Sequence, residues 1–166
     1  ILLGLVGLFL GVSAAASYLV TDYSSWWPNE KEVEVTTTSR DRPVTIDVNN
    51  PDFSRIYEAY QDGRSGDVLS TLNSILEQSS SRTARSKALY HKYVFFQDQQ
   101  QFGAAVDAAD QFVTEYPNHA LRPEVLYGAG LICNQYMSQP CETDFHALLR
   151  EEYPESKWIN ELSGSS

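Results

Sequence analysis

Two Tyr-Pro pairs, Tyr116-Pro117 and Tyr153-Pro154, constrain the fold of this 166-residue chain more than any other feature. Their tyrosines lie 37 positions apart, and self-similarity at roughly 34–40 residues is typical of repeated helix pairs. Because proline disfavours helix at the residue before it, each pair ends a helix at the tyrosine, whose ring closes the apolar face. Asn118 and Ser156 supply the short polar side chains that the following turns need.

The apolar spacing predicts one leading helix and then three helix pairs. Asp52 is the expected N-cap of the leading helix, and Gly63 ends it. A helix pair cannot bury its apolar stripe alone, so consecutive pairs are expected to stack into an all-α repeat domain over residues 52–162, followed by a frayed tail over 163–166. The expected helices are 52–60, then the pairs 67–78 and 84–97, 102–116 and 121–136, and 142–153 and 156–162.

Residues 1–20 contain no charged side chain, and as a helix they would be about 30 Å long, the thickness of a bilayer core. Two interpretations remain open: a retained transmembrane anchor, or the apolar region of a secretion signal with a cleavage site at Ala14–Ala16. We favour the anchor. Gly7 and Gly11 form a G-x-x-x-G motif, and with Ala15 they would let a second transmembrane helix pack closely.

The flank after this segment is acidic, because residues 21–40 carry Asp22 and three glutamates against Lys31 and Arg40. Basic residues hold a flank in the cytoplasm, so this flank is predicted to face outward. Trp26-Trp27 follows the span, where aromatic rings settle at the lipid headgroups. We therefore expect a single-pass protein of the inner (cytoplasmic) membrane with its C-terminal domain in the periplasm or an equivalent space.

Residues 21–51 are expected to form an extended connector between the span and the helices. Its alternating stretches, 33–37 and 44–48, favour either a short β-hairpin or an arm that pairs with a strand of another subunit. A lone hairpin is marginal in water, which keeps the second interpretation open. Asn50-Pro51 is a turn signal that closes the connector.

Cys133 and Cys141 bracket a short link between two predicted helices. In an oxidising compartment they would form a disulfide that pins this link. The alternative is two separate buried thiols, which are common. Two cysteines without a nearby histidine do not make a zinc site, so no metal site is predicted.

The net charge of −10 disfavours nucleic acid as a partner, since phosphate binding needs a basic face. The motifs of nucleotide-binding loops, zinc peptidases, serine hydrolases and EF-hands do not occur, so we predict no enzyme and no cofactor. His119 is expected to be a solvated loop residue, and His91 and His146 to be packing or surface residues. A remote alternative is a hydrolase that depends on four carboxylates, Asp107, Asp110, Glu151 and Glu152.

The segment 102–130, FGAAVDAADQFVTEYPNHALRPEVLYGAG, resembles a tetratricopeptide-like (TPR or Sel1-like) helical repeat. More narrowly, it resembles the degenerate repeats of bacterial envelope proteins such as the Tol–Pal-associated periplasmic coordinator and the Bam-complex lipoprotein. Val125 stands where their pattern has alanine, and the chain lacks their lipobox cysteine near its start. The matching positions are Ala108, Phe112, Tyr116, Pro117, Tyr127 and Gly130.

The resemblance implies a scaffold: a membrane-anchored, extracytoplasmic, non-catalytic accessory subunit of a larger envelope complex. The alternative within this class is a periplasmic assembly factor or chaperone-type adaptor. Expected partners are subunits of a membrane complex, a peptide or protein in the concave groove, and the lipid bilayer through residues 1–20. Because tyrosine is enriched at binding surfaces, the candidate protein-binding residues are Tyr57, Tyr60, Tyr90, Tyr93 and Tyr127, unless these rings belong to the core. The arm from Glu32 to Val48 is a second contact candidate.

Overall fold

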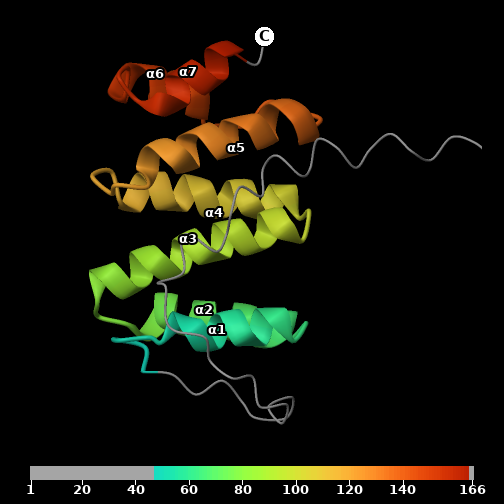
Figure 1. Ribbon diagram of the computed structural model, residues 1–166, viewed down its shortest axis with the longest axis vertical. Coiled ribbons are helices and arrows are strands. Elements are labelled where there is room, and N and C mark those ends of the chain that lie inside the picture. Colours follow the sequence, from blue (N-terminus) through green and yellow to red (C-terminus); the bar gives the residue numbers. More distant parts are fainter. Residues whose placement is uncertain (1–46, 165–166) are drawn as a thin grey trace, which may run out of the picture. The chain divides into compact units, whose positions relative to one another are not determined.

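The computed structural model describes residues 47–164, which form helices and contain no strand (Figure 1). This part of the chain is therefore all-α, as predicted. Val48 lies in a turn closed by the hydrogen bond from Asn50 N to Asp47 O (3.1 Å). The proposed anchor with Gly7, Gly11 and Ala15, and the connector up to residue 46, lie outside the described residues. Within residues 47–164, no helix has both the length and the apolar character needed to span a bilayer.

The helices follow the predicted order of one leading helix and three pairs. Each helix from α1 to α5 packs against the next helix in the chain. The last helix, α7, packs against α5. Figure 1 shows this succession from α1 to α7. The bounds are α1 Phe53–Gln61, α2 Ser65–Gln78, α3 Arg82–Asp98, α4 Phe102–Glu115, α5 Arg122–Tyr136, α6 Phe145–Glu152 and α7 Lys157–Gly164.

Local signals set most helix ends. The side chain of Asp52 caps α1 by accepting a hydrogen bond from Ser54 N, as predicted, and Gly63 takes a positive φ of 72° after it. Helix α6 begins three residues later than expected, because Asp144 caps it through Ala147 N (2.9 Å). Helix α7 continues to Gly164, so the start of the expected tail is helical.

Two sets of apolar side chains form the interior. The first lies between α1, α2 and α3 and includes Ile56, Leu72 and Phe95. The second continues through α4, α5 and α6, where the largest fully buried side chains are Phe112, Phe145, Leu126, Ile132 and Leu149. Each helix from α1 to α6 buries at least two side chains, whereas none of residues 157–163 in α7 is buried.

Candidate interaction surface

The first Tyr-Pro pair lies at the end of α4, where this helix contacts the start of α3. Tyr116 is buried and is the C-cap of α4, with its N–H donating to Phe112 O (3.0 Å), so the last helical residue is Glu115, one residue before the predicted end. The Arg82 guanidinium, at the start of α3, lies 5.3 Å from the centroid of the Tyr116 ring. Arg82 Nη2 also donates to Glu115 O (2.9 Å), a carbonyl that the end of the helix leaves without an intrahelical partner. We call the group of Arg82, Glu115 and Tyr116 the Tyr116 joint.

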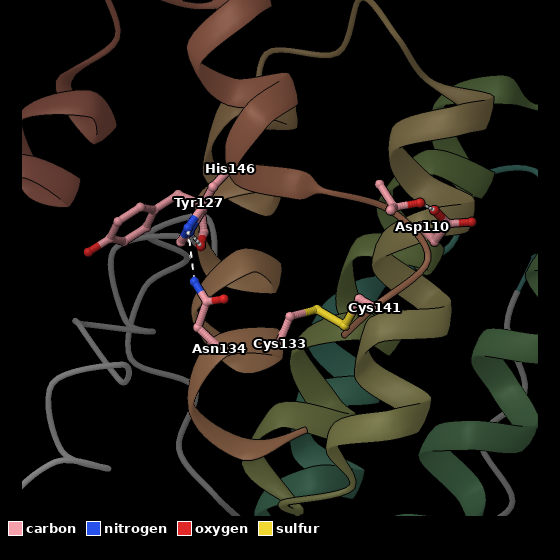
Figure 2. The surroundings of a disulfide bond; sticks show 7 residues. Asp110, Tyr127, Cys133, Asn134, Cys141 and His146 are labelled. Carbon is pink, nitrogen blue, oxygen red and sulfur yellow. Dashed lines mark hydrogen bonds between the residues drawn. A yellow bond between two sulfur atoms is a disulfide. The ribbon is translucent and has the colours of Figure 1, made fainter. Parts of the chain in front are cut away.

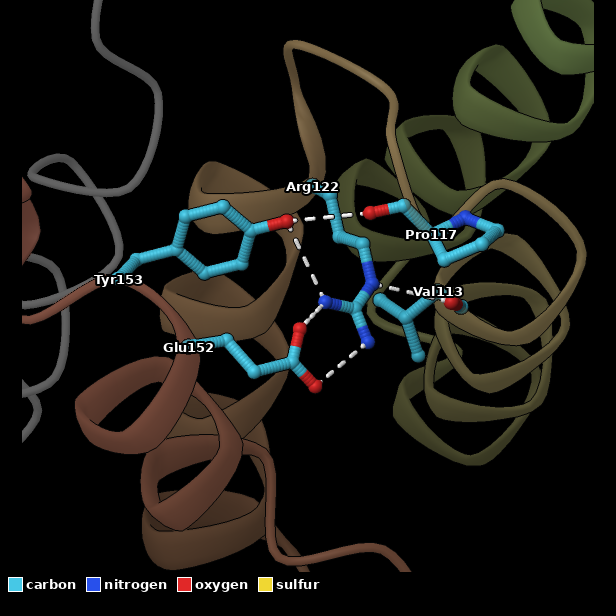
Figure 3. A network of polar contacts seen from close by, with 5 residues as sticks. All are labelled: Val113, Pro117, Arg122, Glu152 and Tyr153. Atoms are coloured by element: carbon cyan, nitrogen blue, oxygen red, sulfur yellow. Dashed lines mark hydrogen bonds and ion pairs between the residues drawn. The ribbon is translucent and has the colours of Figure 1, made fainter.

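The second Tyr-Pro pair joins α5 to α6 in the same way (Figure 3). Tyr153 N donates to Leu149 O (3.0 Å), and the Arg122 guanidinium lies 5.7 Å from the Tyr153 ring centroid. Arg122 binds both oxygens of the Glu152 carboxylate, through Nη1 and through Nη2 (3.2 Å). We call Arg122, Glu152 and Tyr153 the Tyr153 joint.

Arg122 is the best-connected polar side chain of this joint, and only 6% of it is exposed. Its Nε donates to Val113 O (3.0 Å) in α4, and its Nη1 also donates to the Tyr153 hydroxyl (3.3 Å). That hydroxyl in turn donates to Pro117 O (3.1 Å), so the network in Figure 3 connects the end of α6 to the turn after α4. A buried guanidinium needs such partners, because a charge without them is costly inside a protein.

The two turns after the tyrosines also match. His119 N donates to Tyr116 O (3.0 Å), and Ser156 N donates to Tyr153 O (2.9 Å). Each side chain then accepts a backbone N–H two residues on: His119 Nδ1 from Leu121 (3.1 Å) and Ser156 Oγ from residue 158 (3.4 Å). His119, rather than Asn118, is therefore the counterpart of Ser156.

His119 is half-buried, which corrects the expectation of a solvated loop residue. Its ring lies 5.1 Å from the Phe112 ring and 6.4 Å from the Tyr116 ring, between centroids. Burial lowers the pKa of His119 below its ordinary value, because the charged ring loses hydration there.

Two of the five candidate tyrosines, Tyr90 and Tyr93, lie in the interior, so a partner does not reach them in this conformation. The Tyr90 hydroxyl donates to Glu124 (2.8 Å), and Gln97 donates to the Tyr93 hydroxyl (2.7 Å). Burial raises the pKa of Glu124, while the bond from Tyr90 acts in the opposite direction. Tyr90 and Tyr93 are therefore core residues, which was the alternative left open for them.

The other three candidate tyrosines are half-buried and lie on two helices that are not neighbours. Tyr57 and Tyr60 are on α1, where the Tyr60 hydroxyl donates to Asp98; burial and then Asp98 raise the pKa of Tyr60. Tyr127 is on α5, and its ring stacks on Trp158 of α7 with 4.9 Å between centroids. The five tyrosines thus do not form one surface patch: Tyr90 and Tyr93 lie together in the interior, with 6.3 Å between ring centroids, and the other three lie on α1 and α5.

Cys133 and Cys141 form a disulfide with a Cα–Cα distance of 5.9 Å, which fastens the link between α5 and α6 to the end of α5 (Figure 2). Two hydrogen bonds flank it. Thr143 donates to Asp110 of α4, and Asn134 donates to His146 Nδ1 (3.3 Å). The start of α6 is therefore held by one covalent bond and two polar contacts.

His146 is buried between α6 and α5, and both of its ring nitrogens have partners. Its Nε2 donates to Tyr127 O (3.1 Å), which assigns the proton to Nε2 and leaves Nδ1 as the acceptor. The ring lies so close to Gly130 that a Cβ there would come within 2.1 Å of His146 Cδ2. Gly130 thus permits the contact, and His146 is a packing residue, as predicted.

The carboxylates of the hydrolase alternative belong to different environments. Asp110 accepts the hydrogen bond of Thr143, and Glu152 is paired with Arg122. Asp107 and Glu151 are exposed on α4 and α6. Residues 47–164 contain no group of three or more histidine, cysteine, aspartate or glutamate side chains that would hold a metal ion.

No family model, curated protein or solved structure matches this chain. The site is therefore interpreted from its own geometry. Sequence reasoning missed Arg82 and Arg122 because they lie more than 30 positions before the tyrosines that they contact. The available signal was the shared Glu-Tyr-Pro at 115–117 and 152–154, each with an arginine at the start of the preceding helix.

Proposed function

We propose that this chain is a non-catalytic scaffold: a tetratricopeptide-like array of helix pairs that holds partner proteins within a larger membrane complex. The observation that carries the proposal is the repeated joint. Arginine, glutamate and tyrosine recur at both connections between pairs, as expected of an array in which each pair contacts only its neighbours. Three polar side chains that could serve a reaction centre instead form hydrogen bonds between helices; they are Arg122, His146 and Asp110. These bonds support a binding role rather than a reaction centre.

The proposed setting is extracytoplasmic, with residues 1–20 as the membrane anchor and the inner membrane as the location. The disulfide supports this setting, since such bonds persist in oxidising compartments and are rare in the cytosol. The uncharged sequence of residues 1–20 supports the anchor.

Co-purification from membranes tests the scaffold function. The full chain is extracted in mild detergent and compared with a variant in which an unrelated span of equal length replaces residues 1–20. Membrane proteins recovered with the native chain at a fixed ratio, and lost with the replaced span, are the expected result. Recovery of the chain alone would overturn the proposal. Low-yield recovery of many soluble envelope proteins would favour the transient adaptor instead.

Substitution of the accessible tyrosines locates the contact. Tyr57→Ala and Tyr127→Ala are expected to reduce partner recovery, because each removes a half-exposed ring from a candidate surface. Tyr136→Ala is the matched control, since Tyr136 is exposed but stacks on Phe102, outside the candidate set. Equal recovery with all three variants would exclude the tyrosines as contacts.

A further inference from the structure

Helix α3 is basic in a chain whose net charge is −10. Four of its 17 residues are lysine or arginine, and its one carboxylate, Asp98, is the last residue of the helix. A local charge opposite to that of the whole chain marks the part of a surface where a partner of complementary charge gains most. The side of α3 that carries these cations is therefore a candidate contact surface.

Three of the four cations lie on one side of α3, and we call Arg82, Arg85 and Lys92 the α3 basic face. At 3.6 residues per turn, their positions in the sequence place them within about 80° of one another around the helix axis. Arg82 and Arg85 donate to Glu115 at the end of α4, and Lys92 Nζ donates to Asn73 Oδ1 of α2 (2.9 Å). The α3 basic face thus lies between α2 and α4, the neighbours of α3 in Figure 1.

The cations of this face keep much of their capacity to bind an anion. The Arg85 side chain is 41% exposed, and its Nη2 reaches the Glu115 carboxylate only at 3.5 Å. Arg82 is exposed and Lys92 is half-buried, and no carboxylate of residues 47–164 forms an ion pair with either. The contact between Arg85 and Glu115 shows that a carboxylate fits this face, and the remaining charge is available to a second one.

Lys92 and Asn73 together offer hydrogen-bond donors to an anion. Asn73 accepts from Lys92 through its amide oxygen, which leaves its NH₂ group as the part that a ligand would meet. Among residues 47–164, this hydrogen bond is the one polar contact of Lys92, so the ammonium group keeps further N–H donors. A carboxylate is the complementary side chain, because it only accepts hydrogen bonds and carries the opposite charge.

We propose that the α3 basic face binds an extended acidic segment of a partner protein, one with two carboxylates three positions apart. Lys92 and Arg85 are separated by about 10 Å along the helix axis. In a polyproline II segment, side chains at i and i+3 point the same way and lie about 9 Å apart. One carboxylate would lie on Lys92 and Asn73, and the other on Arg85 and Arg82. This inference rests on the proposed scaffold function and names the chemistry of one partner.

The probe is a labelled peptide of about ten residues, with two glutamates three positions apart and proline and serine elsewhere. Fluorescence anisotropy measures its affinity for the full chain in detergent. Lys92→Gln should weaken binding by about 5-fold, because one partly exposed ion pair contributes modestly, and adding Arg85→Gln should bring the loss to about 20-fold. The matched control is Lys87→Gln. It removes the same charge from an exposed position about 140° away around α3, and it should leave the affinity unchanged.

Asn73→Asp separates binding from folding. The new carboxylate keeps the contact with Lys92, so the urea midpoint should not fall, but it neutralises the lysine and repels the peptide, and the affinity should decrease by about 10-fold. A peptide of the same charge with adjacent glutamates should also bind more weakly, because its two carboxylates point to different sides. Absence of peptide binding, or equal affinity of the native chain and Lys92→Gln, would overturn the proposal. An equal loss with Lys87→Gln would also reject it, since it would show general attraction to positive charge.

Other occupants of the α3 basic face give different results in the same assay. If a second copy of the chain covers the face, peptide binding should weaken as the concentration of the chain rises. If an acidic segment of the same chain covers it, replacing Glu30, Glu32 and Glu34 by glutamine should raise the affinity for the peptide. Either result rejects the proposal. Because the assay needs no native partner, its failure leaves the co-purification test of the scaffold function unaffected.

Discussion

The Tyr116 and Tyr153 joints are built from the same three residue types but differ in how their arginine is held. Arg82 is exposed, contacts its tyrosine ring and donates to one backbone carbonyl. Arg122 is buried, and it binds a carboxylate, a hydroxyl and a carbonyl of α4. A recurring sequence motif therefore fixes the position of the contact, whereas burial decides how much the contact stabilises the fold.

The largest expected effect is the loss of the buried arginine. Arg122→Ala removes the partner of the Glu152 carboxylate and leaves Val113 O without its donor in the interior. Removing one partner of a buried pair typically costs about 3–5 kcal/mol, and Glu152 is partly exposed, so we expect about 2–4 kcal/mol. Urea unfolding of the chain measures this change.

The matched variant for that experiment is Arg122→Met, which keeps much of the side-chain volume and removes the charge. If the network rather than the packing provides the stability, Arg122→Met should be nearly as destabilising as Arg122→Ala. A cost below about 1 kcal/mol for either variant would mean that the buried joint is no stronger than an exposed pair.

The links that precede α4 and α6 differ as well, and the disulfide gives the second-largest effect. Eight positions separate Cys133 and Cys141, and closing so short a loop stabilises by about 2.5 kcal/mol in the chain-entropy model. Cys133→Ser with Cys141→Ser should remove this amount, with faster hydrogen exchange concentrated in α6. Because these are the chain's two cysteines, a dithiol reductant should reproduce the effect in the native chain and do nothing to the double variant.

The link before α4 contains no disulfide, but one of its residues has a strained backbone conformation. Gln100 has a positive φ of 55°, a conformation that costs a residue with a Cβ about 1 kcal/mol. Gln100→Gly should therefore stabilise the chain by about 0.5 kcal/mol, after allowing for the greater freedom of glycine in the unfolded state. Gln99→Gly is the control, since Gln99 has a negative φ of −77° and should lose stability. A loss of stability with Gln100→Gly would show that the side chain outweighs the strain.

Periodicity and turn chemistry were sufficient to predict the helices, since the order of one leading helix and three pairs agrees with the structure. Asp52 and the prolines after Tyr116 and Tyr153 act locally, so a sequence shows them directly. The start of α6 was misplaced because its cap, Asp144, lies three residues after Cys141, beyond the loop that the disulfide closes. The local spacing of apolar residues does not show at which residue a helix begins after such a link.

The site was harder to predict, because its contacts join residues that are far apart in the sequence. The sequence left Tyr90 open as either a contact residue or a core residue, and what settles its place is the hydrogen bond from its hydroxyl to Glu124, which lies 34 positions later. Arg122 and Glu152 are separated by 30 positions. A buried polar side chain is acceptable only when its partner is in place, and a single sequence does not supply that pairing.

The exposed arginine, Arg82, should contribute much less than the buried Arg122. Arg82→Ala is expected to cost less than about 1 kcal/mol, because a partly hydrated cation gains little from a ring and a carbonyl at the surface. Raising the salt concentration should reduce the cost further, whereas the cost of Arg122→Ala should change little. Equal costs for the two alanine variants in urea unfolding would contradict the ranking of the joints by burial.

The smallest effect concerns the turn acceptors, His119 in the first joint and Ser156 in the second. Burial lowers the pKa of His119 in the folded chain, so the unfolded chain binds more protons as the pH falls through the ordinary histidine value of 6.5. The contribution of His119 is therefore complete above that pH and decreases below it, because a protonated Nδ1 no longer accepts from Leu121 N. His119→Ser copies the acceptor of the second joint, which does not titrate in this range. The difference in unfolding free energy between pH 7.5 and pH 5 should be smaller in the variant than in the native chain. An unchanged difference would show that the acid sensitivity comes from another residue. The next residue to replace would then be His91, because burial lowers its pKa to about 4.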